Sequence, residues 1–358
     1  MDLPQTPQPE PPKTSEPAPQ ASPAQTPPSG EPPIEQTALV LESEGLTPRK
    51  VATFVIDAIL VIMAPILVTV AIGILQTVRP EKLVSERTPK DLGLAYEDVS
   101  LKTADGVPLA AWYVPAAQAT GAAVLVLHGY PADKGDVLPR AAFLQKTYNL
   151  LLIDFRSFGK SGGSYTTLGP KEVGDALAGI DELRRRGMTR IGIYGFSMGA
   201  NVALMTLPRT DAVDAVVAEA ANADLRSVIE EPYRYLGPLK GVAASITAIV
   251  ARLALGIDID RQSPAAAVAG TKKPILLIHS KADQVVPFAQ AETLKDRLKD
   301  DPAAEFWFTE KEGHGEPSTD FAAHVQDFFD RHLAAQGGEG TGDRGQGATA
   351  PPASVPAP

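Results

Sequence analysis

The stretch IGIYGFSMGANVA at residues 191–203 decides the fold. Apolar residues precede Gly195 and small residues follow Gly199, so the pattern predicts a strand that turns directly into a helix. Because glycine has no Cβ, these two positions let the strand and the helix approach closely. The turn would expose the Ser197 hydroxyl at a helix N-terminus, where backbone N–H groups stabilise negative charge. A glycine- and serine-rich helix start without chemistry is the alternative.

Strand and helix patterns alternate around this turn. From Ala122 onward the alternation predicts an α/β fold, with a mainly parallel, twisted sheet and helices on both of its faces. A hairpin around Asp105-Gly106 precedes the alternating part. The expected strands are 97–103, 109–114, 122–127, 150–153, 191–194, 215–218, 275–278 and 305–308. The expected helices are 141–145, 171–186, the run after Ser197, 288–298 and 320–333.

One segment, residues 222–269, is too long for a plain connection. It follows a strand at the sheet edge where ligands bind in such folds, and it carries a helical pattern at 241–255. We expect a helical cap over the site, and a peripheral structural insertion is the alternative. The cap's apolar residues would cover the pocket or pack on the domain: Val242, Ile246, Ile249, Val250 and Leu253.

The composition of the two ends of the chain is typical of segments without a fold of their own. Residues 1–50 begin with a segment in which twelve of the first 33 residues are proline, and residues 336–358 are rich in glycine, proline and alanine. Neither composition offers enough apolar surface to offset the entropy of ordering, which predicts disorder. A proline-recognising protein partner of the first tail is a weaker expectation.

Residues 51–78 predict one transmembrane helix. Residues 58–75 contain no charged side chain, and a helix of this length spans a bilayer. The apolar run is too long and begins too late for a cleavable signal peptide, so we expect a retained single-pass anchor, followed by a linker at 79–95. Two basic residues precede the helix and four follow it, which weakly favours a cytoplasmic position for the domain that follows.

The composition excludes several classes of site. The chain has no cysteine, so disulfides and thiolate chemistry are absent, and a net charge of −10 without a basic patch argues against nucleic acid as a partner. No cluster with metal-ligand spacing is present, and we expect neither a metal nor a cofactor.

A serine nucleophile needs a base, and the base needs an orienting carboxylate. His314 is the strongest candidate base because it lies alone between two glycines on a loop before the last helix. For the carboxylate, Asp283 follows the strand at 275–278, and Asp224 is its competitor. The other histidines lie in helices or end strands, where packed or exposed roles are expected: His128, His279, His324 and His332.

The chain from about Tyr96 to Ala335 resembles the α/β-hydrolase superfamily. The motifs that carry the resemblance are LHGYPAD (127–133), DFRSFGKSGG (154–163), GFSMG (195–199), HSKADQVVP (279–287) and EGHGE (312–316). The chain is most similar to the single-domain serine hydrolases akin to the catalytic domains of prolyl oligopeptidases and dienelactone hydrolases. Several membrane-anchored members share an anchor followed by a strand hairpin.

The resemblance implies a hydrolase domain over 96–335 and a role for each site residue. Ser197 would be the nucleophile, His314 the general base and then acid, and Asp283 the orienting carboxylate. The backbone N–H groups of Tyr130 and Met198 would form the oxyanion hole. Asp154 and Arg156 match a family loop of mostly structural role.

The expected activity is that of a serine hydrolase that cleaves carboxylic esters, thioesters or amides through an acyl-enzyme. The segment before residue 96 shows no β-propeller of the kind that selects oligopeptides, which disfavours a peptidase. An acyltransferase with the same triad and a catalytically silent scaffold remain as alternatives. The expected partners are a small acyl substrate and the membrane.

Overall fold

The computed structural model describes residues 47–118, 120–261 and 263–333. Both predicted tails lie almost entirely outside these residues, so their predicted disorder stays a prediction. The chain divides into two units, residues 1–55 and 56–358. Of the first unit only residues 47–55 are described, and they form the start of the first helix.

Eight strands of the described chain form one sheet in the order β1-β2-β4-β3-β5-β6-β7-β8. β1 and β2 form an antiparallel hairpin and β2 pairs antiparallel with β4, whereas every pair from β4 to β8 is parallel. The strands are β1 Glu97–Lys102, β2 Pro108–Val114, β3 Ala122–Leu127, β4 Asn149–Ile153, β5 Arg190–Phe196, β6 Ala215–Glu219, β7 Ile275–Ser280 and β8 Ala304–Thr309. All eight expected strands are present, and the predicted fold class is confirmed.

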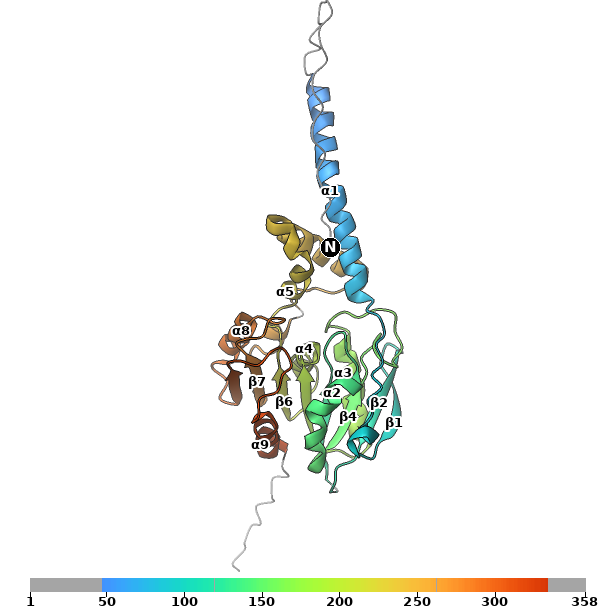
Figure 1. The fold of residues 1–358 in the computed structure, drawn as a ribbon, viewed down its shortest axis with the longest axis vertical. Coiled ribbons are helices and arrows are strands. Elements are labelled where there is room, and N and C mark those ends of the chain that lie inside the picture. Colours follow the sequence, from blue (N-terminus) through green and yellow to red (C-terminus); the bar gives the residue numbers. More distant parts are fainter. Residues whose placement is uncertain (1–46, 119, 262, 334–358) are drawn as a thin grey trace, which may run out of the picture. The chain divides into compact units, whose positions relative to one another are not determined.

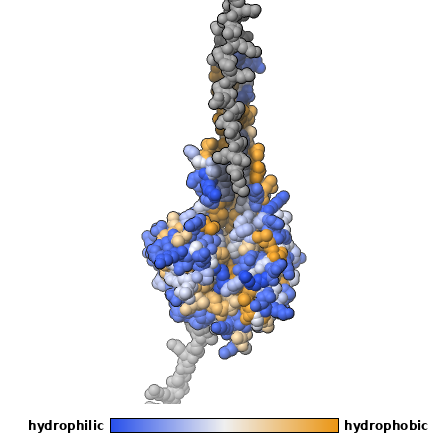
Figure 2. Space-filling model, in the orientation of Figure 1, coloured by the Kyte–Doolittle hydropathy of each residue, from blue (hydrophilic) through white to orange (hydrophobic). Residues whose placement is uncertain are grey.

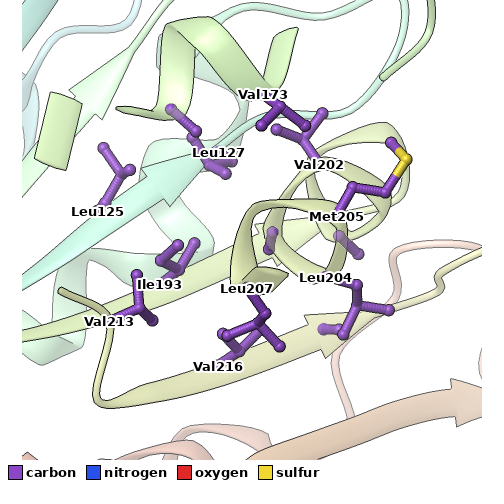
Figure 3. Close-up of a cluster of buried hydrophobic side chains, with 14 of the residues drawn as sticks. Leu125, Leu127, Val173, Ile193, Val202, Leu204, Met205, Leu207, Val213 and Val216 are labelled. Atoms are coloured by element: carbon purple, nitrogen blue, oxygen red, sulfur yellow. The ribbon is translucent and has the colours of Figure 1, made fainter. Parts of the chain in front are cut away.

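Helices cover both faces of this sheet (Figure 1). α3 (Glu172–Arg185), α4 (Met198–Thr206) and α8 (Phe288–Leu298) pack on one face, and α2 (Lys134–Ala141) and α9 (Phe321–Leu333) pack on the other. Each face of the sheet has its own core: the first core lies under α3, α4 and α8, and the second under α2 and α9. Successive side chains of a strand point to opposite faces, so Leu125 and Ile193 belong to the first core and Val124 and Tyr194 to the second. Figure 3 shows the first core, where α4 lies against β3, β5 and β6.

Two regions differ from the sequence-based expectation. The sequence did not predict α2, because Pro139 interrupts its helical pattern. The helix is stabilised at its start by Asp133, whose side chain accepts hydrogen bonds from the N–H groups of Gly135 and Asp136. The predicted linker 79–95 contains a 3-10 helix, η1 (Pro89–Leu92), and is hydrogen-bonded to the domain through Ser85 N–H and the Asp133 carboxylate. The short helix η2 (Ala142–Lys146) matches the expected helix at 141–145.

The apolar helix α1 spans Pro48–Val78, three residues longer at its start than expected. Two described helical segments are long and apolar enough to cross a membrane, α1 and Leu225–Leu253. Most side chains of α1 are exposed, including Val61, Ile62 and Val68. Figure 2 colours apolar residues orange and shows a largely hydrophilic surface on the domain that contains the sheet. By its length and composition α1 is a candidate membrane span.

Helices fill the predicted cap segment. They are α5 (Leu225–Glu230), η4 (Glu231–Leu239), α6 (Lys240–Val250), the π-helix η5 (Ala251–Leu255) and α7 (Pro264–Ala267). The face expected to be buried is mostly exposed: of its five apolar residues, only Ile246 packs against a buried cluster with Ile66 and Val70 of α1. The residues of α6 that are fully buried in this cluster are the small Ala243 and Ala244. Small side chains at a contact let two helices approach closely.

Tyr233 joins the cap to α1. Its side chain is 2% exposed, and its hydroxyl lies 2.9 Å from Thr247 Oγ1 and donates to the carbonyl of Val70 at 3.4 Å. The ring packs against Gly73, where a Cβ would lie 3.0 Å from the Tyr233 hydroxyl. Tyr235, two residues along, is 69% exposed.

Removing the Tyr233 ring should therefore loosen the cap. Tyr233→Ala is expected to cost about 3–5 kcal/mol of stability, the usual loss for a buried aromatic residue. Tyr235→Ala is the matched control and should change stability by about 0.5 kcal/mol or less. Thermal unfolding and limited proteolysis of the full chain in detergent measure both. Equal effects of the two substitutions would contradict the packing of Tyr233 between α1 and α6.

Candidate active site

Ser197 lies at the strained turn between β5 and α4. Its backbone has φ 53° and ψ −114°, a conformation that residues with a side chain rarely adopt. A Cβ on Gly195 would overlap the backbone of Gly199, and a Cβ on Gly199 would overlap the carbonyl of Leu127, so only glycine fits at either position. Ser197 N–H donates to the carbonyl of Glu219 on β6 at 2.8 Å, which fixes the turn to the neighbouring strand.

The three residues expected to act together lie together. His314 Nε2 is 3.2 Å from Ser197 Oγ, and His314 Nδ1 is 2.7 Å from Asp283 Oδ2. Asp283 follows β7 and His314 follows β8, so each lies beyond the carboxyl end of a strand, as ligand-binding residues do in parallel sheets. The short Nδ1 contact favours the tautomer in which Nδ1 carries the proton and Nε2 is free to accept one from serine.

Asp283 is held in its charged form. Burial opposes ionisation, but hydrogen bonds from His314 and from the N–H groups of Val286 and Val285 outweigh it and lower the pKa of the carboxyl. The two N–H groups donate to Oδ1 at 2.8 Å each, which leaves Oδ2 for His314. A fixed carboxylate of this kind orients an imidazole and stabilises its protonated form.

The other candidates have structural partners. Asp224 caps α5 by accepting from Ser227 N–H at 2.7 Å. His128 is fully buried, accepts from Phe155 N–H at Nε2 and contacts the Gly129 carbonyl through Nδ1; burial lowers its pKa. His279 lies 2.9 Å from the Val286 carbonyl. His324 stacks on a tryptophan ring, and His332 lies near a glutamate on β8.

A pocket of about 410 Å³ opens in front of Ser197. Tyr130 and Met198, the two expected oxyanion-hole residues, line it together with Ser197, and residues of the cap segment form its opposite wall. Met198 is the first residue of α4, so its N–H has no acceptor within the helix. The Tyr130 hydroxyl is 3.5 Å from the carbonyl of Gln76, near the end of α1.

Asp154 and Arg156 make contacts away from this pocket. Asp154 forms a buried ion pair with Lys134 at 2.5 Å and accepts from the N–H of Lys160. Arg156 bridges two carboxylates, Asp105 and Asp175, at 2.7 Å each. Neither residue lines the pocket at Ser197, and both hold loops beside the sheet.

Arg140 of α2 was not expected, and it holds the histidine loop. Its guanidinium pairs with Glu219 and with the Tyr194 hydroxyl, and it donates to the carbonyl of Gly315, next to His314. It also stacks over the ring of Phe196, 4.6 Å from the centroid. No sequence pattern indicates this role, because the residues that meet here come from four separate segments of the chain: α2, β5, β6 and the loop after β8.

No group of three or more His, Cys, Asp or Glu side chains within the described ranges is arranged to hold a metal ion. The site that the geometry assembles consists of a hydroxyl, an imidazole, a carboxylate and backbone N–H groups. These groups are sufficient for acyl transfer, in which serine attacks a carbonyl carbon.

Sheet order, the strained serine turn and the strand-end positions of the site residues define an α/β-hydrolase. The chain belongs to the prolyl oligopeptidase family, whose model matches residues 140–336. The esterase Pf2001 of Pyrococcus furiosus is 30% identical and superposes with a TM-score of 0.59 over 71% of this chain and 99% of that structure. The chain therefore has the α/β-hydrolase fold of the esterase- and peptidase-like type.

Other relatives share part of the chain. The protein bem46 of Schizosaccharomyces pombe is 27% identical over 207 residues, 56% of this chain and 64% of that protein. The α/β-hydrolase domain-containing protein WAV2 of Arabidopsis thaliana is 27% identical over 210 residues. An acylaminoacyl peptidase of Pyrococcus horikoshii has a TM-score of 0.53 at 21% identity, a likeness of fold alone. The chain spans just under two thirds of bem46, the first of these relatives.

The contacts of Arg140 predict a double effect of Arg140→Met. The substitution leaves Glu219 buried without its partner, which should cost about 3–5 kcal/mol, and it frees the loop that carries His314, which should lower kcat. Arg331→Met is the control, since Arg331 pairs at the surface with its side chain 46% exposed and should cost about 1 kcal/mol or less. Thermal unfolding and ester hydrolysis measure the two effects.

A double variant separates stability from positioning. Arg140→Met with Glu219→Leu removes both buried charges and should recover part of the lost stability. The contact with Gly315 remains missing, so kcat should stay low. Full recovery of kcat along with stability would show that Arg140 has no positioning role.

Proposed function

We propose that this protein is a membrane-anchored serine hydrolase that cleaves carboxylic esters through an acyl-enzyme on Ser197. The observation that carries the proposal is the continuous chain of contacts from Ser197 Oγ through His314 to Asp283, at 3.2 and 2.7 Å. A serine next to an oriented imidazole is the arrangement that makes a hydroxyl nucleophilic at neutral pH.

In the first half of the reaction His314 Nε2 accepts the proton of Ser197 as Oγ attacks the ester carbonyl carbon. The developing oxyanion takes hydrogen bonds from the N–H groups of Met198 and Tyr130, each worth about 3 kcal/mol in the transition state. His314 then protonates the leaving alcohol. In the second half His314 deprotonates water, which releases the carboxylic acid and regenerates Ser197.

Esters are favoured over other acyl substrates by one comparison, the 30% identity to a solved protein named as an esterase. A peptide substrate is the second candidate, since the family that matches residues 140–336 is named for oligopeptidases. Thioester cleavage and transfer of the acyl group to an alcohol use the same steps and differ only in the leaving group or the acceptor.

The nucleophile is tested with a fluorophosphonate probe on the full chain in detergent. Wild type should be labelled and should hydrolyse p-nitrophenyl acetate, while Ser197→Ala should lose both labelling and at least about 10⁴-fold of kcat. Ser227→Ala is the matched control, because Ser227 lines the same pocket but its hydroxyl donates to the carbonyl of Asp224. A folded wild type that is neither labelled nor active would instead support a catalytically silent scaffold, and faster cleavage of the matching amide would support a peptidase.

We also propose that α1 anchors the protein in a membrane. Residues 58–75 of this helix contain no charged side chain, and most of their side chains are exposed. The full chain should therefore stay in the membrane fraction through an alkaline carbonate wash. Val61→Arg with Val68→Arg should release it, since each arginine costs about 2.5–3.5 kcal/mol at the centre of a membrane helix. Val61→Leu with Val68→Leu should not, and release of wild type itself would contradict the anchor.

A further inference from the structure

A second cavity lies beside the pocket of Ser197. Its volume is about 320 Å³, within the range of small-molecule sites. The last turns of α1 form one wall, the loop around Leu168 another, and the cap the third. Its lining is dominated by aliphatic side chains, such as Leu225, Ile229, Val250 and Ile257.

The two spaces adjoin. Thr77 at the end of α1, Leu168 and Pro232 of the cap each line both the apolar cavity and the pocket that contains Ser197. These three residues are therefore a wall that the apolar cavity shares with the pocket of Ser197. The apolar cavity therefore borders the pocket of Ser197 directly.

The chemistry of the walls selects an apolar occupant. The polar groups of Tyr233 and Thr247 at the cavity bond to each other and to backbone carbonyls, so they are satisfied without a ligand. Among the described residues that line the cavity, Arg79 is the one that is charged at neutral pH. A chain of methylene groups gains free energy by leaving water for such a space, whereas a polar or charged group loses it.

The elements around the cavity also present apolar side chains to the outside. Val61, Ile62 and Val68 of α1 are more than half exposed, and so are Ile249 and Leu253 of the cap. Exposed apolar surface of this extent marks a surface that contacts a membrane or a partner. Since α1 is itself the proposed anchor and packs on α6, the cavity is bounded by the elements that would lie nearest the bilayer.

We propose that the apolar cavity binds the acyl chain of a long-chain carboxylic ester taken from the bilayer, with the ester carbonyl at Ser197. This rests on the proposed function and names its substrate class. The carbonyl carbon bonds to Ser197 Oγ, the alcohol leaves with a proton from His314, and water then releases a long-chain carboxylic acid. The end of α1 is thus a wall of the substrate site as well as part of an anchor.

Filling the cavity tests the proposal. Val250 lines it and is 38% exposed, so a larger side chain has room to enter. In vesicles, Val250→Trp should lower the rate on p-nitrophenyl dodecanoate relative to the rate on p-nitrophenyl acetate by about tenfold or more, since each excluded methylene is worth roughly fourfold. Leu253→Trp is the matched control, 82% exposed and outside the lining, and should keep the wild-type ratio of the two rates.

The outcomes separate the two proposals. If wild type cleaves the acetate but Val250→Trp keeps the wild-type ratio, the acyl-chain site is wrong and the hydrolase stands. If wild type cleaves neither ester and takes no fluorophosphonate, the proposed function itself fails. Should Val250→Trp lose acetate activity as well, Ala251→Leu places a smaller obstruction in the same wall, and its ratio of rates decides.

The source of the substrate has its own measurement. Dodecanoate ester placed in the same vesicles as the enzyme should be cleaved with a higher initial rate than the same ester supplied in a second population of vesicles. The acetate, which is soluble in water, should show no such difference. Equal initial rates for the dodecanoate would overturn uptake from the bilayer.

Discussion

The close approach of β5 and α4 around Ser197 is the constraint on which the site depends. Two glycines make the approach possible, and the fully buried residues of β5 and α4 on either side hold the unfavourable backbone of Ser197 in place. The turn aims the hydroxyl out of the sheet and leaves the N–H of Met198 unpaired within its helix. One local geometry therefore supplies both the proposed nucleophile and half of the proposed oxyanion hole.

The proposed base and carboxylate reach Ser197 from the loops that follow β8 and β7. Asp283 is fixed by two backbone N–H groups, whereas His314 lies on the loop between β8 and α9. Arg140 holds this loop by donating a hydrogen bond to the carbonyl of Gly315, and Glu219 neutralises the charge of its guanidinium. A buried ion pair contributes little net stability in general, so its value here is positional.

The contact between α1 and the cap changes the role of the N-terminal part of the chain. α1 packs on α6 and Tyr233, and its last turns line the pocket of Ser197 and the neighbouring apolar cavity. A helix that only tethered the domain to a membrane would not need to line the site. With α1 as a wall, the proposed anchor and the selection of an acyl chain become properties of the same element.

The sequence by itself determined the sheet, the serine turn and the chemical identity of the site. The buried parallel strands read as apolar runs and the β1–β2 hairpin as two strands around a turn, so all eight strands were predicted. Ser197, Asp283 and His314 were predicted as well, because each lies in the turn or loop that follows a strand. Such signals are local. α2 was missed because Pro139 obscured its pattern, and the cap's buried face was misjudged because its contact with α1 uses alanines in place of large apolar residues.

Only the tertiary structure decided which distant residues support the site. Arg140, Glu219 and Gly315 meet from three segments more than seventy residues apart, and no spacing in the chain encodes that meeting. The apolar cavity is likewise a product of packing, since α1 and the cap are separated by more than a hundred residues. The periodicity of a strand or a helix depends on neighbouring residues in the sequence, whereas the walls of a pocket depend on which surfaces the fold brings together.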